Sequence, residues 1–318
     1  MATIPEQTVS VVIPCYNGMP YLPDALDSVF AQTERPDQVV VVDDGSSDGS
    51  ADCVRAYTGR HPDRPIELIQ QKNGGESAAR NAGINASTCA WVAQLDADDW
   101  WDARKLGKQL AAAERTGSDC VLVHTGQVTH HFDGRSNEMP MERAAERVGW
   151  CTKQLVEPVG LAHSSILVRR DALCRIGGYD ADLLHAVDID LYFRVSVEGT
   201  FTFVPERLVH YRIHPHQTSW NFKLDQVRYH HRVVRRFFNS HPDLAEEIGA
   251  DFIEEALGHH VATKLESFWW NRHLEEFRGL LAFADEQGYR SAALCGWHRK
   301  ARWPDWLIRL RDKLGSRN

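Results

Sequence analysis

Three carboxylates stand within four residues, at Asp96, Asp98 and Asp99. They follow the short, mainly apolar run 91–95, which predicts a buried strand, and alternation along a strand would place Asp96 and Asp98 on the same side. Carboxylates this close repel each other unless a proton or a cation lies between them. Paired oxygen ligands suit Mg²⁺ or Mn²⁺, which commonly bridge protein carboxylates and substrate phosphates. The cluster therefore predicts a metal or phosphate site.

Helix capping is the competing explanation for these aspartates. The sequence predicts a helix that begins near Asp102, and an aspartate just before a helix commonly accepts hydrogen bonds from its first backbone N–H groups. Capping by Asp98 or Asp99 would account for one of the carboxylates but not for all of them. We therefore expect a cation site in which Asp99 is the member that could instead start the next helix.

The strands expected around this cluster belong to an α/β fold. Residues 9–14 and 39–42 are β-branched runs with little polar alternation, which is typical of strands buried on both faces. Helical spacing follows the first run, and 66–69 is a third short strand before the one at 91–95. Strands that alternate with helices predict a doubly wound, mostly parallel sheet flanked by helices.

In such a sheet the ligand lies at the carboxyl ends of the strands. Polar clusters follow three of the expected strands, at 14–17, 43–48 and 96–99. The dinucleotide fingerprint G-x-G-x-x-G and the phosphate loop G-x-x-x-x-G-K-[ST] are both missing after the first strand. The acidic strand ends instead indicate hydrogen bonds to a base or ribose and a metal for a diphosphate.

Four motifs, in this order, resemble those of the family 2 glycosyltransferases. They are Ser10-Val11-Val12-Ile13-Pro14-x-Tyr16-Asn17, Val42-Asp43-Asp44-Gly45-Ser46-x-Asp48, Asn73-x-Gly75-x-x-x-Ala79-Arg80-Asn81-x-Gly83 and Leu95-Asp96-x-Asp98-Asp99. The resemblance implies a GT-A fold with a Rossmann-like central sheet, a nucleotide-sugar donor and a divalent cation, Mn²⁺ or Mg²⁺. It also implies transfer of the sugar with inversion at its anomeric carbon.

The same resemblance assigns roles to residues at the strand ends. Asp44, with Asp43 beside it, would contact the base, which is usually uracil in this family. Asp98 would be the main metal ligand, supported by Asp99, and Asp96 would hold both the ribose and the metal. The other implied nucleotide contacts are Pro14, Tyr16 and Asn17 around the base and Arg80 near the ribose or diphosphate. The alternatives are a turn aspartate for Asp44, an exposed helix arginine for Arg80, and strand termination for Pro14 and Tyr16.

A second segment, beginning at Val187, resembles the catalytic segment of the family. The family usually shows Glu-Asp there, with Leu three and Arg six residues after the Asp, and Leu191 and Arg194 fit this spacing. Asp188 would then be the catalytic base, since the acceptor hydroxyl must lose its proton as it attacks the anomeric carbon. Val187 replaces the usual Glu. Asp188 could also be the N-cap of the helix predicted here, and Asp190 is the second candidate base.

A third segment, Tyr211-Arg212-x-His214 followed by Thr218-Ser219, resembles the loop that covers the diphosphate in this family. Arg212 and His214 could neutralise the charge of the leaving group, because an arginine fork matches phosphate oxygens. His163, at the start of a strand predicted over 163–168, is expected on the same diphosphate or acceptor side.

The composition is that of an ordinary globular protein, with 318 residues, 43% of them hydrophobic and 25% charged. A net charge of −8 argues against a nucleic-acid-binding protein. Seven scattered cysteines without a C-x-x-C pair predict reduced thiols and a cytoplasmic location. We expect neither a signal peptide nor a membrane-spanning segment.

The C-terminal part of the chain has a helical pattern, so we expect a catalytic domain at 1–220 and a helical region at 221–318. The last stretch, 297–318, combines tryptophans and leucines with many arginines. This composition suits a helix that lies on an anionic membrane, as in a peripheral protein of the inner membrane face. It also suits a helix packed on the bundle with its charges in water.

Together these features predict an inverting, metal-dependent glycosyltransferase that moves a sugar from a UDP-sugar to a hydroxyl of a glycan or lipid-linked glycan. A sugar-nucleotide pyrophosphorylase shares the sheet type, but it would need a Gly-rich loop with Arg or Lys after the first strand, which 14–18 does not supply. A non-catalytic nucleotide- or glycan-binding descendant is the other alternative, because Val187 departs from the family pattern.

Overall fold

The computed structural model describes residues 7–64, 66–138, 140–157, 161–215, 217, 223–289 and 292–303. The chain divides into two compact units. Unit 1 comprises Met1–Leu155 and Val159–Gln217, and unit 2 comprises Val156–Pro158 and Thr218–Asn318. Among the helices that the structure describes, none combines the length and hydrophobicity needed to cross a bilayer.

Unit 1 is built on a nine-stranded sheet with helices on both faces. Its strands are β1 (Val9–Cys15), β2 (Gln38–Asp43), β3 (Ile66–Gln70), β4 (Trp91–Gln94), β5 (Trp100–Trp101), β6 (Cys120–His131), β7 (Ser136–Glu138), β8 (Leu167–Arg169) and β9 (Thr200–Ile213). Its helices are α1 (Leu22–Phe30), α2 (Ser50–Arg60), α3 (Glu76–Ala86), α4 (Lys105–Thr116), α5 (Met141–Ala145), α6 (Thr152–Leu155), the 3-10 helix η1 (His163–Ser165), α7 (Arg170–Arg175) and α8 (Val187–Ser196).

The first four strands form one parallel part of this mixed sheet, and β6 and β9 form another parallel pair. The strand order is β3-β2-β1-β4-β8-β6-β9-β5, with β7 paired to β6. β1 pairs in parallel with β2 and β4, and β2 pairs in parallel with β3. The carboxyl ends of these four strands therefore meet at one edge of the sheet, where a doubly wound fold binds its ligand.

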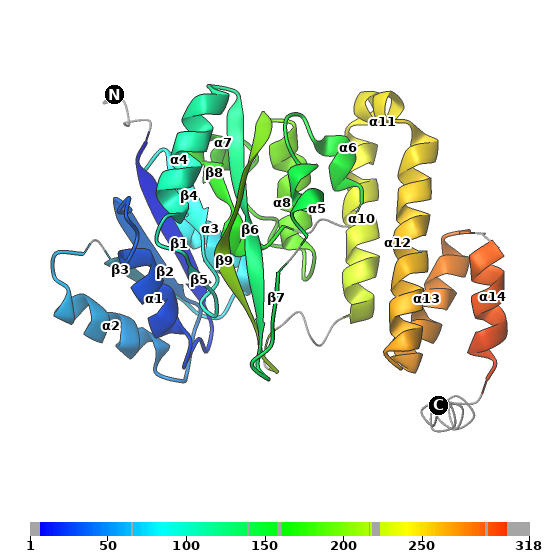
Figure 1. Ribbon diagram of the computed structural model, residues 1–318, viewed down its shortest axis with the longest axis horizontal. Helices are drawn as coiled ribbons and strands as arrows, with labels where there is room; N and C mark the ends of the chain where they lie inside the picture. The colour runs from blue at the N-terminus through cyan, green and yellow to red at the C-terminus, as the bar shows by residue number, and fades with distance from the viewer. Residues whose placement is uncertain are drawn as a thin grey trace. The chain divides into compact units, whose positions relative to one another are not determined.

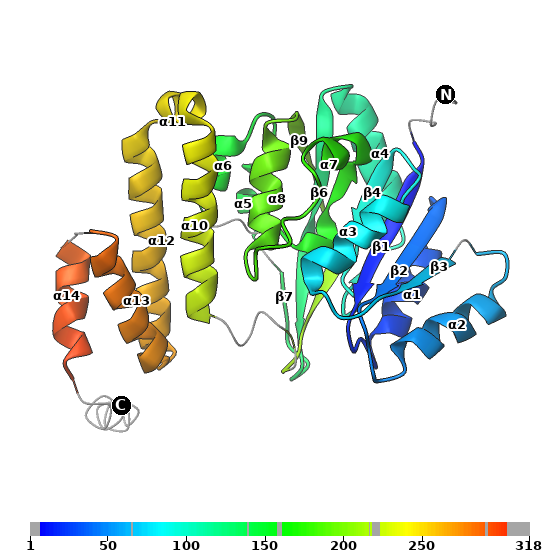
Figure 2. The same ribbon diagram turned by 180° about the vertical axis from the view of Figure 1, so that it is seen from behind.

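Burial on both faces explains the β-branched strands, because every side chain of a covered parallel strand must pack. Val39 and Val41 of β2 face the core that α1, α2 and α4 share. Val40 and Val42 face the other way and pack against Ala79 of α3. Figures 1 and 2 show α1 and α4 on one face of the sheet and α3, α7 and α8 on the other.

Several predicted boundaries are wrong around the acidic cluster. β4 ends at Gln94, so the three aspartates lie in the turn after the strand, and strand alternation is not what brings them together. The strand predicted over 163–168 begins as the 3-10 helix η1, and only β8 is extended. The region 126–160, which has no clear periodicity, contains the end of β6, β7, α5 and α6.

Unit 2 is helical, as the spacing of its apolar residues predicts. Its helices are α10 (Lys223–Ser240), α11 (Pro242–Ile248), α12 (Ala250–Trp270), α13 (Leu274–Glu286) and α14 (Ala292–Ala301). Val261 and Leu265 of α12 pack with Phe277 and Leu281 of α13 in one buried cluster. The stretch 297–318 is described only to 303, and Thr218 and Ser219 also lie outside the described residues.

The packing of α3 on β1 makes a testable prediction at Gly83. A Cβ atom at Gly83 would lie 2.3 Å from Val12 Cγ1, whereas one at Gly59 of α2 would meet nothing within 4 Å. Gly83→Ala should therefore lower the free energy of unfolding by about 1–3 kcal/mol through overpacking. Gly59→Ala should raise it by up to about 1 kcal/mol through helix propensity. Urea unfolding followed by circular dichroism measures both, and equal effects would contradict the tight contact.

Candidate active site

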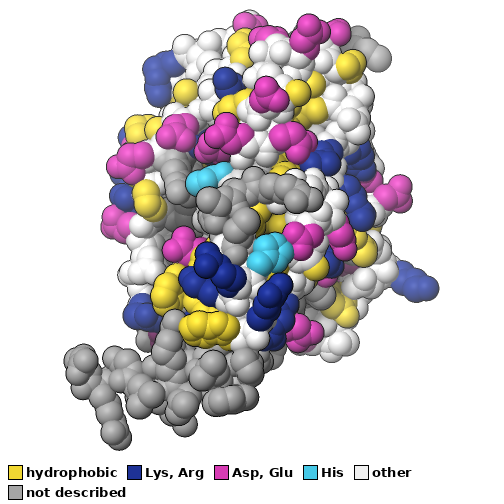
Figure 3. Space-filling model, turned by 90° about the vertical axis from the view of Figure 1, so that its right-hand side faces the viewer, with side chains coloured by type: hydrophobic (Ala, Val, Ile, Leu, Met, Phe, Trp, Pro, Cys, Tyr) yellow, Lys and Arg dark blue, Asp and Glu magenta, His cyan; other side chains and the backbone are white. Residues whose placement is uncertain are grey.

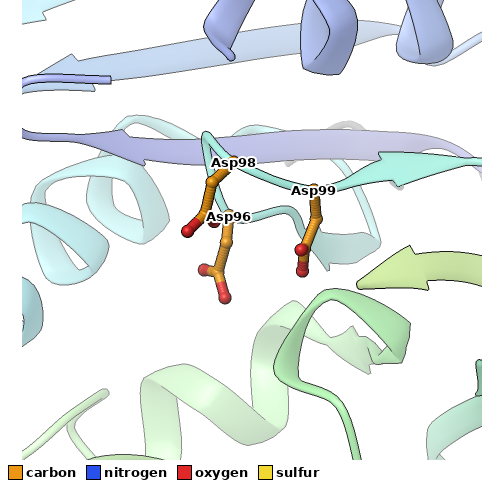
Figure 4. A group of neighbouring side chains, drawn as sticks. All are labelled: Asp96, Asp98 and Asp99. Carbon is orange, nitrogen blue, oxygen red and sulfur yellow. The ribbon is translucent and has the colours of Figure 1, made fainter. Parts of the chain in front are cut away.

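The three aspartates of the turn after β4 lie close enough to share one cation. Asp96, Asp98 and Asp99 each offer a carboxylate oxygen, and these oxygens all lie within 4.8 Å of one another. Figure 4 shows the three side chains leaving the turn in the same direction, with Asp96 and Asp98 adjacent. Three negative charges in this space require compensation, and a different part of the chain compensates each one.

Asp99 is the buried member of the cluster. Its Oδ2 accepts a hydrogen bond from Ser164 Oγ at 2.6 Å, and its Oδ1 accepts one from the backbone N–H of Arg212 at 2.9 Å. Burial, together with the charges of Asp98 and Asp96, raises the pKa of Asp99 well above its usual range. Asp99 does not cap α4, because the N-cap of that helix is Arg104. The capping interpretation is therefore wrong.

Asp98 is held by the end of β9. Its Oδ2 lies 3.0 Å from His214 Nε2, and its backbone oxygen accepts a hydrogen bond from Arg212 Nε at 2.9 Å. Arg212 also donates to Asp24 and lies over the rings of Tyr21 and Trp100. Arg212 and His214, which were predicted on the diphosphate side, thus contact the acidic turn itself. The Oδ1 atom of Asp98 has no hydrogen-bond partner among the described residues.

Asp96 is paired with Arg80 of α3, which is buried rather than exposed on its helix. The guanidinium donates to Asp96 at 2.7 Å, to Glu76 at 2.7 Å and to Gln94 at 3.3 Å. Burial alone would lower the pKa of Arg80, but the charges of Asp96 and Glu76 outweigh it and raise that pKa. Burial raises the pKa of Asp96; Arg80 opposes the increase, and the charges of Asp98 and Glu76 add to it.

Asp43 and Asp44 organise the loops at the ends of β2 and β3. Asp43 holds the turn, because its Oδ1 accepts from the N–H of Ser46 at 3.1 Å. Asp44 instead accepts from Gln71 at 2.7 Å and from the N–H groups of Gly74 and Gly75, both at 2.9 Å. A carboxylate offers about four acceptor positions, so Asp44 retains about one while it fixes the loop that starts α3.

The loop after β1 is tied to the loop after β2. Asn17 adopts a left-handed conformation, with φ of 52°, and exchanges hydrogen bonds with Ser46 and Ser47. Tyr16 beside it is 57% exposed, as a side chain available to stack on a ligand would be. Pro14 lies within β1, opposite Val42 of β2, so it does not terminate the strand.

Asp188 lies in the first turn of α8. The N-cap of α8 is Ala186, which has a left-handed conformation, so the alternative that Asp188 is the N-cap is excluded. Burial and the charge of Glu76 raise the pKa of Asp188 to about 6. This carboxylate can therefore exchange a proton near neutral pH, as a general base must.

Asp190, the second candidate base, is bound within its own helix. Its Oδ2 accepts from Arg194 Nε at 2.7 Å. Arg194 in turn donates to the backbone oxygens of Ile176 and Gly178, at 2.9 and 2.7 Å. This arrangement anchors the turn after α7 to α8 and gives Asp190 and Arg194 a structural role.

His163 joins two buried tyrosines behind the acidic turn. Its Nδ1 lies 3.0 Å from Tyr192 Oη, and its Nε2 is hydrogen-bonded to Tyr179 Oη. Burial, followed by the charge of Arg80, lowers the pKa of His163 well below its usual range. A neutral imidazole with both nitrogens engaged connects α8 to η1 and positions neighbouring groups.

Four residues of this network were not assigned roles from the sequence: Glu76, Ser164, Tyr179 and Tyr192. Glu76 stands four residues before Arg80 on the same helix, a spacing at which opposite charges pair, so it could have been found. Ser164 contacts Asp99 across 65 positions of the chain, and no local pattern signals such a contact.

Comparison with known proteins agrees with this arrangement. Residues 10–174 match the domain described as glycosyl transferase family 2. The chain belongs to this family. This match confirms the resemblance of its motifs and makes the protein a nucleotide-sugar glycosyltransferase.

Two relatives carry names from this family. An uncharacterized glycosyltransferase of Rickettsia prowazekii (strain Madrid E) is 29% identical over 224 residues, which cover 69% of this chain and 68% of the relative. An uncharacterized glycosyltransferase of Nostoc sp. (strain PCC 7120) is 32% identical over 216 residues, which cover 65% of each chain. The match thus spans slightly less than two thirds of the Nostoc protein.

Solved structures share the fold of this glycosyltransferase. TarS residues 1–349 of S. aureus, in complex with UDP-GlcNAc, superposes with a TM-score of 0.63 at 16% identity, covering 86% of this chain and 79% of that 1–349 chain. The mannosyltransferase PcManGT of Pyrobaculum calidifontis, in complex with GDP-Man and Mn²⁺, gives 0.57 at 18% identity, covering 93% and 87%. At identities this low, the superpositions establish the fold alone. The shared fold confirms the predicted GT-A architecture.

Ser164 and its neighbour Ser165 provide a matched pair of substitutions that tests how the acidic turn is supported. The Ser164 hydroxyl donates to Asp99 and accepts from the N–H of Asp96, whereas the buried hydroxyl of Ser165 has no partner among the described residues. Ser164→Ala should lower the free energy of unfolding by about 1–3 kcal/mol, because it leaves one oxygen of the buried Asp99 carboxylate without its donor. Ser165→Ala should be neutral or stabilising. Chemical denaturation measures the free energy of unfolding of both variants. A larger loss of stability in Ser165→Ala than in Ser164→Ala would refute the role assigned to Ser164.

Proposed function

We propose that this glycosyltransferase is an inverting, metal-dependent enzyme that moves a sugar from a UDP-sugar to a hydroxyl of a glycan or lipid-linked glycan. The observation that carries the proposal is the acidic turn, whose Asp96 and Asp98 each keep one carboxylate oxygen without a hydrogen-bond partner among the described residues. Arg80 and His214 hold the other oxygens of these two carboxylates. The turn thus combines fixed geometry with open ligand positions.

The donor set of the turn fits a hard divalent cation. Oxygen atoms are the ligands that Mn²⁺ and Mg²⁺ prefer. Burial raises the pKa values of Asp96 and Asp99, repulsion among the carboxylates adds to this increase, and a cation would relieve the repulsion. Asp98 would be the main ligand and Asp96 the second, while the buried Asp99 supports the turn from behind. Such a cation, when bound, neutralises charge on the diphosphate of the donor. The Mn²⁺ in the PcManGT complex supports this proposal.

The base and ribose of the donor would lie along the ends of β1 and β2. Tyr16 offers an exposed ring for stacking, with Pro14 and Asn17 beside it, and Asp44 keeps acceptor capacity for a ring N–H. Arg80 and Asp96 come next and would face the ribose. UDP-GlcNAc in TarS and GDP-Man in PcManGT are the donors in the related folds, and we propose UDP as the nucleotide here.

Asp188 would be the catalytic base. It takes the proton of the acceptor hydroxyl as that oxygen forms its bond to the anomeric carbon. The bond from the anomeric carbon to the diphosphate oxygen breaks in the same displacement, so the nucleoside diphosphate leaves and the configuration inverts. Burial and, after it, the charge of Glu76 raise the pKa of Asp188, while Val187 stands where the family usually has Glu.

Arg212 and His214 would act mainly by positioning. The guanidinium already contacts Asp24 and the backbone of Asp98, and the imidazole contacts the Asp98 carboxylate. We therefore propose that both residues orient the metal ligand, and that His163 with its two tyrosines supports the same turn from the other side. We also propose that Arg212 or His214 contacts the diphosphate of the donor.

A thermal-shift screen of nucleotide sugars, with and without Mn²⁺, tests the donor and the metal together. A donor at about 100 times its dissociation constant should stabilise the protein by about 2.7 kcal/mol, and a UDP-sugar should do so more strongly when Mn²⁺ is present. Asp98→Asn should abolish the Mn²⁺ effect. Asp119→Asn, an exposed carboxylate just before β6, is the control and should preserve it. Stabilisation that is independent of Mn²⁺ in the unmodified protein would overturn the metal proposal.

The pH dependence of kcat/KM tests Asp188 as the base. Its carboxylate must be deprotonated to act, and its pKa is raised to about 6. The rate should therefore rise about tenfold per pH unit below 6 and level off above it. Asp188→Asn should reduce kcat by about 10²–10⁴-fold, whereas the exposed Asp182→Asn should not. Glu76→Gln should shift the inflection to lower pH, because it removes a charge that raises the pKa. An unchanged profile in Asp188→Asn would eliminate this residue as the base.

A further inference from the structure

Unit 2 carries an aromatic and basic surface where the end of α12 meets α14. We define the Trp–Arg face by Trp269, Trp270, Arg272, Arg278, Lys300 and Trp303. Figure 3 views this side of the protein, and Lys and Arg side chains gather in the lower half of the view beside hydrophobic ones. Asp and Glu side chains are more frequent in the upper half, and several also border the basic side chains. Basic and hydrophobic side chains thus adjoin one another on this side.

Two cations of the Trp–Arg face, Lys300 and Arg272, lie against tryptophan rings. Trp269 is buried and packs on Trp297 of α14, with ring centroids 6.0 Å apart. The Lys300 ammonium lies 3.9 Å from the centre of the Trp297 ring, and the Arg272 guanidinium lies 5.8 Å from the ring of Trp270. A cation over an aromatic face is attracted by the ring quadrupole. The basic groups are thus fixed beside the aromatic ones.

Two tryptophans of this face are exposed, although nothing in the glycosyl transfer uses them. Trp270 is 56% exposed and Trp303 is 37% exposed. Arg278 donates to the backbone oxygens of Ala301 and Trp303, at 3.4 and 3.3 Å, which fixes the end of α14 against α13. Exposed indoles on an ordered surface, with an apolar body and a polar N–H, suit the boundary between water and lipid.

The charge of the adjoining sequence has the sign opposite to that of the whole chain. Residues 297–318 contain seven Lys and Arg against two Asp, whereas the complete chain has a net charge of −8. A local excess of basic residues in an acidic protein directs that end toward an anionic surface. Three of these basic residues, Arg299, Lys300 and Arg302, lie at the described end of α14 or directly after it.

We propose that the Trp–Arg face docks this protein on an anionic lipid bilayer. The indoles of Trp270 and Trp303 would enter the headgroup region, and the adjacent basic groups would pair with lipid phosphates. Basic residues alone would suit any polyanion, but exposed tryptophans among them specify a surface with an apolar interior. This docking is independent of the proposed transfer chemistry, since its residues belong to unit 2 alone.

Vesicle flotation of the full chain tests the proposal. The protein should float with vesicles of phosphatidylcholine that contain about 30 mol% phosphatidylglycerol and not with phosphatidylcholine alone, because basic residues are attracted to anionic headgroups. Raising the salt from about 0.15 M to about 1 M should release most of it, because the screening length falls from about 8 Å to about 3 Å. Failure to float with the anionic vesicles would overturn the proposal.

Two pairs of variants separate docking on a bilayer from binding of any polyanion. Arg302→Gln, at the exposed residue directly before Trp303, should lower the partition coefficient about fivefold, and Trp270→Ser should lower it severalfold. The controls are Arg55→Gln on α2 and Trp150→Ser, which remove exposed residues of the same types from unit 1 and should change nothing. Circular dichroism and donor turnover verify that each variant is folded. Two results together would overturn the proposal: vesicle binding that Trp270→Ser does not change, and binding to heparin that is equally tight at the same charge concentration. They would assign the face to soluble polyanions.

Discussion

Repulsion among the three carboxylates of one turn is the constraint on which the catalytic unit depends. Each carboxylate is compensated from a different direction: Asp96 by Arg80 of α3, Asp98 by His214 after β9, and Asp99 by the Ser164 hydroxyl of η1. These partners lie far apart in the chain, so the turn forms only when the sheet, α3 and the end of β9 are in place. The site and the fold therefore stabilise each other.

Burial separates the roles of chemically similar groups around this turn. Arg80 stays charged because two carboxylates face it, whereas His163 is held neutral by burial and by the charge of Arg80. Asp190 is committed to Arg194, while Asp188, two residues earlier, has a pKa near 6. Neighbouring carboxylates of one helix turn thus differ in their partners because their surroundings differ, which is how one fold can hold groups for different acid–base roles.

Local sequence patterns predicted the sheet and the position of the acidic cluster correctly. The β-branched runs predicted a parallel sheet because a strand covered on both faces has no polar side, and the polar strand ends placed the acidic cluster at its carboxyl edge. The family motifs identified the glycosyltransferase. The alternatives that the sequence left open were excluded by contacts: Asp99 and Asp188 are not helix caps, and Arg80 is not exposed.

The sequence by itself determined the order of strands and helices, the family and the clustering of Asp96, Asp98 and Asp99, because these depend on residue type and spacing along the chain. Tertiary structure decided which carboxylate is buried, which is paired and which keeps a position open. It also brought Ser164 and His214 to the turn and joined Trp270 to α14 in one surface. Those outcomes depend on charge, solvent and distance across the fold, which no local pattern encodes.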